Sequence, residues 1–188
     1  MKQIISTFCC CLCILYTHAQ IKKISEGNVE SVFKVNFLTP GIAYEHPVSK
    51  KVSVYAEVNT TLYIVKYTFS DNINAYVTPN FNVQTRYYFN GEKRIEKNKR
   101  VEKNSMNYVS LYFEKNVARN EHNLPSLTKL GVVWGMQRNQ PGRFSFDFNI
   151  GPGILLNKQS INNYYGYYRY PYFTILGDLK LGIWLGKR

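Results

Sequence analysis

The chain has 188 residues, a mean hydropathy of −0.30, and 24 Lys and Arg against 12 Asp and Glu, which gives a net charge of +12. This length is sufficient for one ordinary domain. Beyond the N-terminus no apolar run approaches the ~20 residues of a membrane-spanning helix, which excludes a polytopic helical membrane protein. Hydrophobic residues make up 45% of the chain and aromatic residues 15%, a composition untypical of disordered proteins.

The N-terminus has the three parts of a secretory signal peptide. Lys2 provides a basic start, Ile4–Tyr16 is a mostly apolar run, and Thr17-His18-Ala19 places small residues where a signal peptidase cleaves. We therefore expect residues 1–19 to be removed on export. All four cysteines lie in this segment, so the exported protein would contain no disulfide. They are Cys9, Cys10, Cys11 and Cys13.

From residue 32 to 188 the hydrophobic pattern has a period of two, which is typical of β-strands. Residues 20–31 are polar and patternless, and we interpret them as a leader segment. Apolar and polar side chains alternate in seven segments, most of them longer than the usual strand of about 5–6 residues. The segments are Phe33–Glu45, Lys51–Val65, Ala75–Phe89, Tyr108–Glu114, Lys129–Gln137, Phe144–Ile154 and Phe173–Leu185.

The first segment keeps its phase only in part. Phe33 and Val35 share one face, whereas Tyr44 has the opposite parity. Pro40-Gly41 lies between them, so the pattern predicts a single strand that is re-phased by a β-bulge. Long antiparallel strands tend to close into a barrel because closure removes their unpaired edges.

The polar faces of these strands are predicted to point into the barrel. They carry charges of both signs at mid-strand positions, which a narrow interior can accommodate as pairs. The predicted interior charge network consists of Glu57, Arg86, Glu114, Asp147, Asp178 and Lys180. The same faces hold Gly131, Gly135, Gly151, Gly153 and Gly182, as expected where side chains crowd a small lumen.

The apolar faces would then contact lipid, as in an outer-membrane barrel. Aromatic residues toward the strand ends would lie at the level of the lipid head groups. They are Tyr63, Tyr67, Tyr87, Tyr88, Trp134, Tyr172 and Trp184. The expected fold is an all-β, antiparallel up-and-down transmembrane β-barrel. Such bacterial barrels usually have an even strand number, so we expect eight strands, with the eighth in residues 20–31 or in the Tyr-rich stretch Asn163–Arg169.

The segment Asn36-Phe-Leu-Thr-Pro-Gly-Ile-Ala-Tyr-Glu45, followed by a tight turn and a new strand, is similar to the opening of a known class of barrel. Together with the signal peptide ending at Ala19-Gln20 and the cysteine-free body, it resembles the small outer-membrane β-barrel proteins of Gram-negative, Bacteroidota-type bacteria. These are described as the outer membrane protein β-barrel domain. The resemblance covers residues 32–188 and implies a monomer in the outer membrane that contacts lipid and lipopolysaccharide.

A basic run in the connection Gly91–Ser105 is the only feature that points to nucleic acid. It comprises Lys93, Arg94, Lys97, Lys99, Arg100 and Lys103. Glu92, Glu96 and Glu102 interrupt it, whereas a phosphate-binding track usually lacks acids and carries stacking aromatics. We therefore expect a solvated loop and no nucleic-acid partner.

No pattern predicts catalysis, a cofactor or a metal site. His122, with Glu121 and Ser126, is the one grouping that a lipid A-modifying enzyme would require, and sequence neighbours in a loop rarely form a nucleophile and its base. The other histidine, His46, lies in a tight turn.

We therefore expect a structural or surface-interaction role. Tyrosines of the last long connection are the candidate contact residues for a protein partner. They are Tyr164, Tyr165, Tyr167 and Tyr168. The main alternative is a secreted lipocalin-like barrel with its faces inverted around a small apolar ligand, and a more distant one is a lipid A-modifying enzyme.

Overall fold

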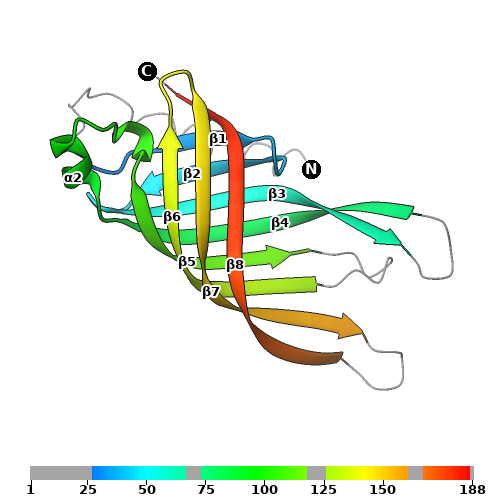
Figure 1. Ribbon diagram of the computed structural model, residues 1–188. Coiled ribbons are helices and arrows are strands. Elements are labelled where there is room, and N and C mark those ends of the chain that lie inside the picture. Colours follow the sequence, from blue (N-terminus) through cyan, green and yellow to red (C-terminus); the bar gives the residue numbers. More distant parts are fainter. Residues whose placement is uncertain (1–26, 67–72, 118–125, 161–166, 187–188) are drawn as a thin grey trace, which may run out of the picture.

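The computed structural model describes residues 27–66, 73–117, 126–160 and 167–186, and its strands form a closed barrel (Figure 1). The eight strands run antiparallel in sequence order, and β8 pairs with β1 to close the ring. The strands are β1 (Val32–Asn36), β2 (Gly41–Pro47), β3 (Val52–Lys66), β4 (Ile73–Tyr88), β5 (Asn107–Asn116), β6 (Ser126–Asn139), β7 (Phe144–Ser160) and β8 (Tyr167–Leu185). The prediction of an eight-stranded up-and-down barrel is confirmed.

The eighth strand lies at neither of the predicted positions. Phe33–Glu45 is a hairpin of β1 and β2, and residues 37–40 form the turn between them, so the predicted bulge is wrong. Phe33 pairs with Tyr44 and Val35 pairs with Ile42. A tight turn and a bulge both shift the parity of a strand, so the change of phase at Pro40-Gly41 fits either structure.

Where the side chains are described, the inner faces of the strands carry the buried residues and the outer faces carry the more exposed ones. In β3, for example, Ser53, Tyr55 and Glu57 are buried, whereas Val54 and Val58 are exposed. Exposed apolar residues occur on all eight strands and include Phe33, Ile42, Val58, Phe81, Leu111, Val132, Ile150 and Leu179. The polar faces therefore fill the interior of the barrel, and the apolar faces form its outer surface.

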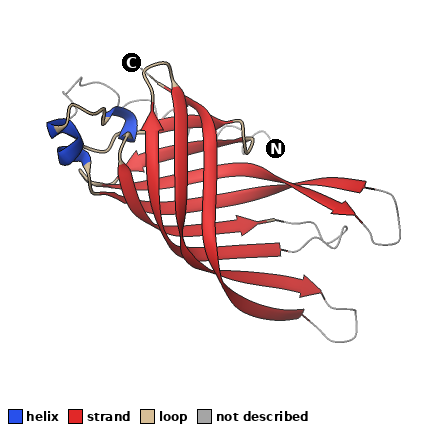
Figure 2. Ribbon diagram, in the orientation of Figure 1, coloured by secondary structure: helices blue, strands red, loops and turns tan. Residues whose placement is uncertain are grey.

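The two ends of the barrel differ (Figure 2). One end, here called the cap end, carries the turns 48–51 and 140–143 and the long β4–β5 connection. At the opposite end, here called the loop end, the β3–β4 and β7–β8 pairs extend beyond the other strands (Figure 1). β1 and β2 have only 5 and 7 residues, so the barrel wall is lowest on their side.

The β4–β5 connection is not the fully solvated loop that the charge pattern predicted. It contains the short helices α2 (Gly91–Glu96) and η1 (Glu102–Asn104), and it buries Val101, Asn104 and Met106. We call residues 91–106 the cap. Its apolar residues pack with Val29, Tyr88 and Tyr108 at the mouth of the barrel. The helix α2 has six residues, too few to show a helical period in the sequence.

The outer aromatic residues only partly match the predicted rim. Tyr87, Trp134 and Tyr172 are exposed, but Trp134 lies five residues from the end of β6 and so not at the rim. Tyr88 and Trp184 are buried in the interior. The inner face is therefore lined by aromatic as well as charged side chains. The side chain of Tyr63 and the whole of Tyr67 lie outside the described residues.

Residues 1–19 lie outside the described part of the chain, as does most of the predicted leader. Its last residues contact the cap end. The Val29 amide donates to the Lys50 carbonyl over 3.0 Å, and the Glu30 amide donates to Asn104 Oδ1 over 2.7 Å. The chain therefore packs against the barrel before β1 begins.

Candidate functional site

The structure places all six residues of the predicted charge network on the inner face of the barrel. Glu57, Arg86, Glu114, Asp147 and Lys180 are buried, and Asp178 is largely covered. Three further charged side chains share this face in the described strands, namely Lys34, Glu45 and Lys129. Four cations thus face five carboxylates, and their formal charges nearly cancel.

Arg86 is the centre of the largest group of contacts. Its Nη1 lies 2.8 Å from Asp147 Oδ2 and 3.8 Å from Glu45 Oε2, and it also donates to Gln137 Oε1. Its Nε donates to Gln84 Oε1 over 2.9 Å. Arginine suits this site because its planar group can donate in several directions at once and never loses its charge.

Two tyrosine rings enclose the Arg86 guanidinium. Its Cζ lies 3.8 Å from the ring centre of Tyr55 and 4.3 Å from that of Tyr108. The Tyr108 hydroxyl donates to Asp147 Oδ1 over 2.6 Å. Tyr108 itself has room only because Gly135 faces it, since a Cβ atom on Gly135 would lie 2.2 Å from the tyrosine ring.

Tyr55 joins this group to a second one around Lys180. Lys180 Nζ lies 4.8 Å from the Tyr55 ring centre and 3.0 Å from Asp178 Oδ2, and it donates to Glu57 Oε2. The Asn36 amide donates to the other oxygen of Glu57 over 2.7 Å. The Tyr55 ring therefore contacts cations of both groups.

Glu114 forms a third, less buried group nearer the loop end. Lys129 Nζ lies 2.7 Å from Glu114 Oε1, and the Tyr112 hydroxyl donates to Glu114 Oε2. Asn82 also donates to Glu114. Each of the three groups thus contains a carboxylate that accepts from both a cation and a neutral side chain, the arrangement that offsets the cost of burying charge.

The predicted charge network omitted Lys34 and Glu45, as it omitted Lys129. Glu45 accepts from Ser53 and Tyr88, each over 2.6 Å, and Lys34 Nζ lies between Glu45 and Asp147, 3.8 and 3.7 Å from their carboxylate oxygens. Both residues belong to the β1–β2 hairpin. The period of two puts both side chains on the inner face whether a bulge or a turn re-phases the segment, so the sequence did carry the signal for them.

The cap closes the interior at one end. Gln137, which contacts Arg86 and Glu45, also donates to the carbonyl of Lys103, and so does Asn139. Outside the barrel, Lys51 Nζ lies 2.8 Å from Glu92 Oε1 and ties α2 to the β2–β3 turn. This hydrogen bond raises the pKa of Lys51 and lowers that of Glu92.

The remaining candidates do not assemble into a reactive site in the described chain. His46 faces outward, and its ring contacts Tyr44. Glu121 and His122 lie outside the described residues, while Ser126 begins β6 and donates to the Asn116 carbonyl. Across the described ranges, no three His, Cys, Asp or Glu side chains are grouped to hold a metal ion.

Two of the four predicted contact tyrosines lie in the described part of the chain. Tyr164 and Tyr165 lie outside the described residues. Tyr167 and Tyr168 lie at the start of β8, where they pair with Ser160 and Gln159, and their side chains are not described. The backbone position puts both tyrosines at the loop end.

Comparison with known proteins gives no relative for this chain: no family model, no curated protein and no solved structure matches it. The resemblance to outer-membrane barrel proteins therefore stays a prediction. No helix in the described ranges is long and apolar enough to cross a membrane.

Proposed function

We propose that the protein is a monomeric outer-membrane β-barrel with a filled polar interior and a structural or surface-interaction role, without catalysis. The observation that carries this proposal is the inversion of the barrel, with apolar side chains outside and hydrogen-bonded charges inside. Transmembrane barrels show this pattern because their outer face meets lipid.

The extent of the apolar surface supports a membrane location. A strand that crosses a bilayer needs about 9–11 residues, and β3 to β8 have 10 to 19. β1 and β2 are shorter, but the apolar surface continues onto their turn through Phe37 and Leu38, which are 55% and 51% exposed. Soluble monomers rarely expose contiguous apolar patches larger than a few hundred Å².

The interior supports a structural role over transport. Arg86, Tyr55, Gln84, Glu45 and Asn149 have no solvent-accessible surface, so side chains fill the cross-section at their level. An eight-stranded barrel is just wide enough for its side chains to achieve this. The same filling argues against the lipocalin-like alternative, since a carrier for an apolar ligand requires an apolar interior.

The strand order supports an orientation in the membrane. Bacterial barrels have short turns on the periplasmic side, and the turns 48–51 and 140–143 both lie at the cap end. We therefore assign the cap end to the periplasm and the loop end, with its tyrosines, to the cell surface. Contacts with lipopolysaccharide or a protein partner would then be made from the loop end.

A pair of matched variants tests the membrane location. Leu111 and Val48 are both 65% exposed, but Leu111 lies at the middle of β5, whereas Val48 lies in a turn at the cap end. Arginine at the bilayer midplane costs about 2–4 kcal/mol, but only about 0–1 kcal/mol near the interface. Leu111→Arg should therefore reduce the folded protein in outer-membrane fractions strongly, and Val48→Arg should not.

Fractionation of the unmodified protein provides the control. Wild-type protein recovered as a freely soluble species, or equal assembly of the two variants, would contradict the membrane location. Equal thermal stability of both variants in detergent would show that Leu111→Arg acts through lipid and not through the barrel interior.

A further inference from the structure

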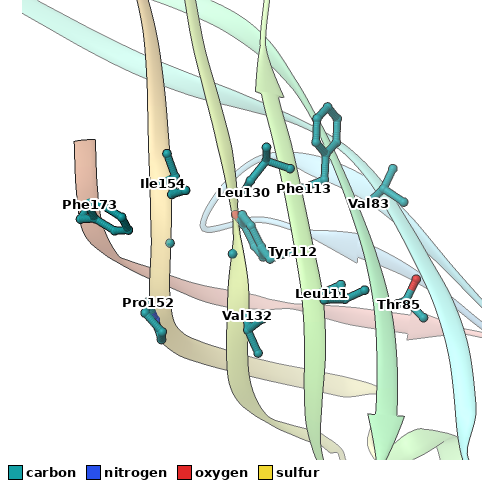
Figure 3. A pocket seen from close by; sticks show the side chains of 12 residues that line it. Val83, Thr85, Leu111, Tyr112, Phe113, Leu130, Val132, Pro152, Ile154 and Phe173 are labelled. Atoms are coloured by element: carbon teal, nitrogen blue, oxygen red, sulfur yellow. The ribbon is translucent and has the colours of Figure 1, made fainter. Parts of the chain in front are cut away.

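The outer wall of the barrel has a hollow of about 630 Å³ on its β4–β8 side (Figure 3). Five residues line it toward the loop end, one from each strand from β4 to β8, and each is the register partner of the next. They are Val83, Phe113, Leu130, Ile154 and Phe173. Leu111, Val132 and Pro152 line it toward the cap end. Its volume lies within the range of binding sites for small ligands, and almost all of these side chains are apolar.

A bend in β7 gives the hollow its shape. The β6–β7 ladder is continuous on both sides but is interrupted where Val132 and Val133 face Gly151 and Pro152. Proline cannot donate to the ladder, and the β7 ribbon turns at Pro152 (Figure 3). The backbones of Gly131 and Gly153 form part of the floor, and Leu176 fills the interior behind them.

A lysine lies next to the hollow on its loop-end side. Lys115 follows Phe113 by two residues on the outer face of β5, and its register partner Thr128 precedes Leu130 on β6. Lys115 Nζ donates to the Thr128 hydroxyl over 3.0 Å, and the described chain offers it no carboxylate. The nearest acid in sequence, Glu114, points inward and pairs with Lys129.

We infer that this wall binds an anionic lipid, with its phosphate at Lys115 and Thr128 and an acyl chain in the hollow. The inference deepens the proposed function and rests on it, because the hollow meets lipid only if the barrel lies in a membrane. Lysine and a hydroxyl are a suitable donor pair for a phosphate. The apolar hollow begins one pair of residues further into the membrane, where the acyl chain of such a lipid starts.

Trp134 provides a fluorescent probe for the bound acyl chain. It is 40% exposed on the outer face of β6, two residues beyond Val132. It lies six residues from Thr128, roughly 20 Å along a tilted strand, and two residues beyond the Leu111–Val132 pair. This places it close to the bilayer midplane, within reach of bromines near the end of an acyl chain. The only other tryptophan, Trp184, is buried inside the barrel and contributes a constant background.

The experiment compares quenching of Trp134 fluorescence by two brominated lipids. The folded full-length protein is placed in phosphatidylcholine vesicles that contain either brominated phosphatidylglycerol or brominated phosphatidylcholine at equal mole fraction. We expect the anionic lipid to bind the wall about fivefold more tightly. Lys115→Gln should remove this preference, Lys115→Arg should retain it, and Lys50→Gln, at an exposed cation of the cap end, should leave it unchanged.

A second variant separates a built site from general attraction to a charged surface. Val132→Phe places a larger ring in the hollow while Lys115 stays intact, so the preference should fall as in Lys115→Gln. A preference that survives Val132→Phe, or equal quenching of the wild type by both lipids, overturns the inference and leaves the membrane location standing. Absence of quenching by either lipid would overturn both.

Discussion

Arg86 has no exposed surface and lies between two tyrosine rings and two carboxylates. Arg86 compensates the negative charges of Glu45 and Asp147, which are equally buried. The other cation near these carboxylates, Lys34, lies 3.7–3.8 Å away. Removing one partner of a buried ion pair costs about 3–5 kcal/mol, since a charge then stays without compensation. We expect Arg86→Met to lower the free energy of unfolding by this amount, as measured by urea titration in lipid vesicles.

The control for this prediction is the double variant Arg86→Met/Asp147→Asn. Its loss of stability should be smaller than the sum of the two single losses, because the uncompensated carboxylate is absent. Lys51→Gln, which breaks an exposed pair with Glu92, should leave the unfolding midpoint unchanged. Additive losses would show that Arg86 and Asp147 act independently.

At the same scale, strand parity put the six charged residues on one face, and their mixed signs at mid-strand positions predicted that this face points inward. Which of them meet did not follow, because partners such as Glu57 and Lys180 lie 123 positions apart and are brought together only by barrel closure. The role of Tyr55 was equally hidden, because a tyrosine in a strand is common on either face. Ring stacking on a cation depends on the diameter of the barrel and not on any local pattern.

Among the elements, the long strands β3 to β8 were the most predictable, since apolar and polar residues alternate along much of each one. The β1–β2 hairpin and the cap were missed for different reasons. The hairpin has short strands around a Pro-Gly pair that also fits a bulge, whereas the cap is held by tertiary contacts. Asn104, for example, bonds both backbone groups of Glu30, at a distance of 74 residues.

Asn104 is expected to hold the cap against the barrel. Its side chain accepts from the Glu30 amide and donates to the Glu30 carbonyl, and its φ is +61°. Asn104→Gly keeps this backbone conformation available but removes both bonds, at a cost of about 1 kcal/mol each. We expect faster tryptic cleavage at Lys97 and Lys99 of the cap, with the barrel strands still protected.

Asn104→Ala serves as the comparison, because alanine loses the same bonds and is also strained at a positive φ. Cleavage of the cap should therefore be fastest in Asn104→Ala, intermediate in Asn104→Gly and slowest in the wild type. Equal rates in all three proteins would mean that the apolar contacts of Val101 and Met106 hold the cap without Asn104.

At the scale of the whole molecule, two layers of side chains lie one behind the other across the lumen of the barrel. The cap covers the periplasmic mouth in the proposed orientation, and the layer of Arg86, Tyr55 and Gln84 fills the cross-section beneath it. The lower layer is held by ion pairs and hydrogen bonds from several strands, so it should persist without the cap. We therefore expect the wild type to show no steady conductance in planar bilayers.

A variant with residues 91–104 replaced by an Asn-Gly turn distinguishes the two layers. Because Arg86, Tyr55 and Gln84 pack without accessible space between them, this shortened barrel should also remain closed to ions. A 16-stranded porin, whose lumen is water-filled, serves as the positive control in the same bilayer. Conductance steps in the shortened barrel but not in the wild type would contradict this expectation. They would show that the cap is the barrier and that the polar interior lets ions pass once the cap is removed.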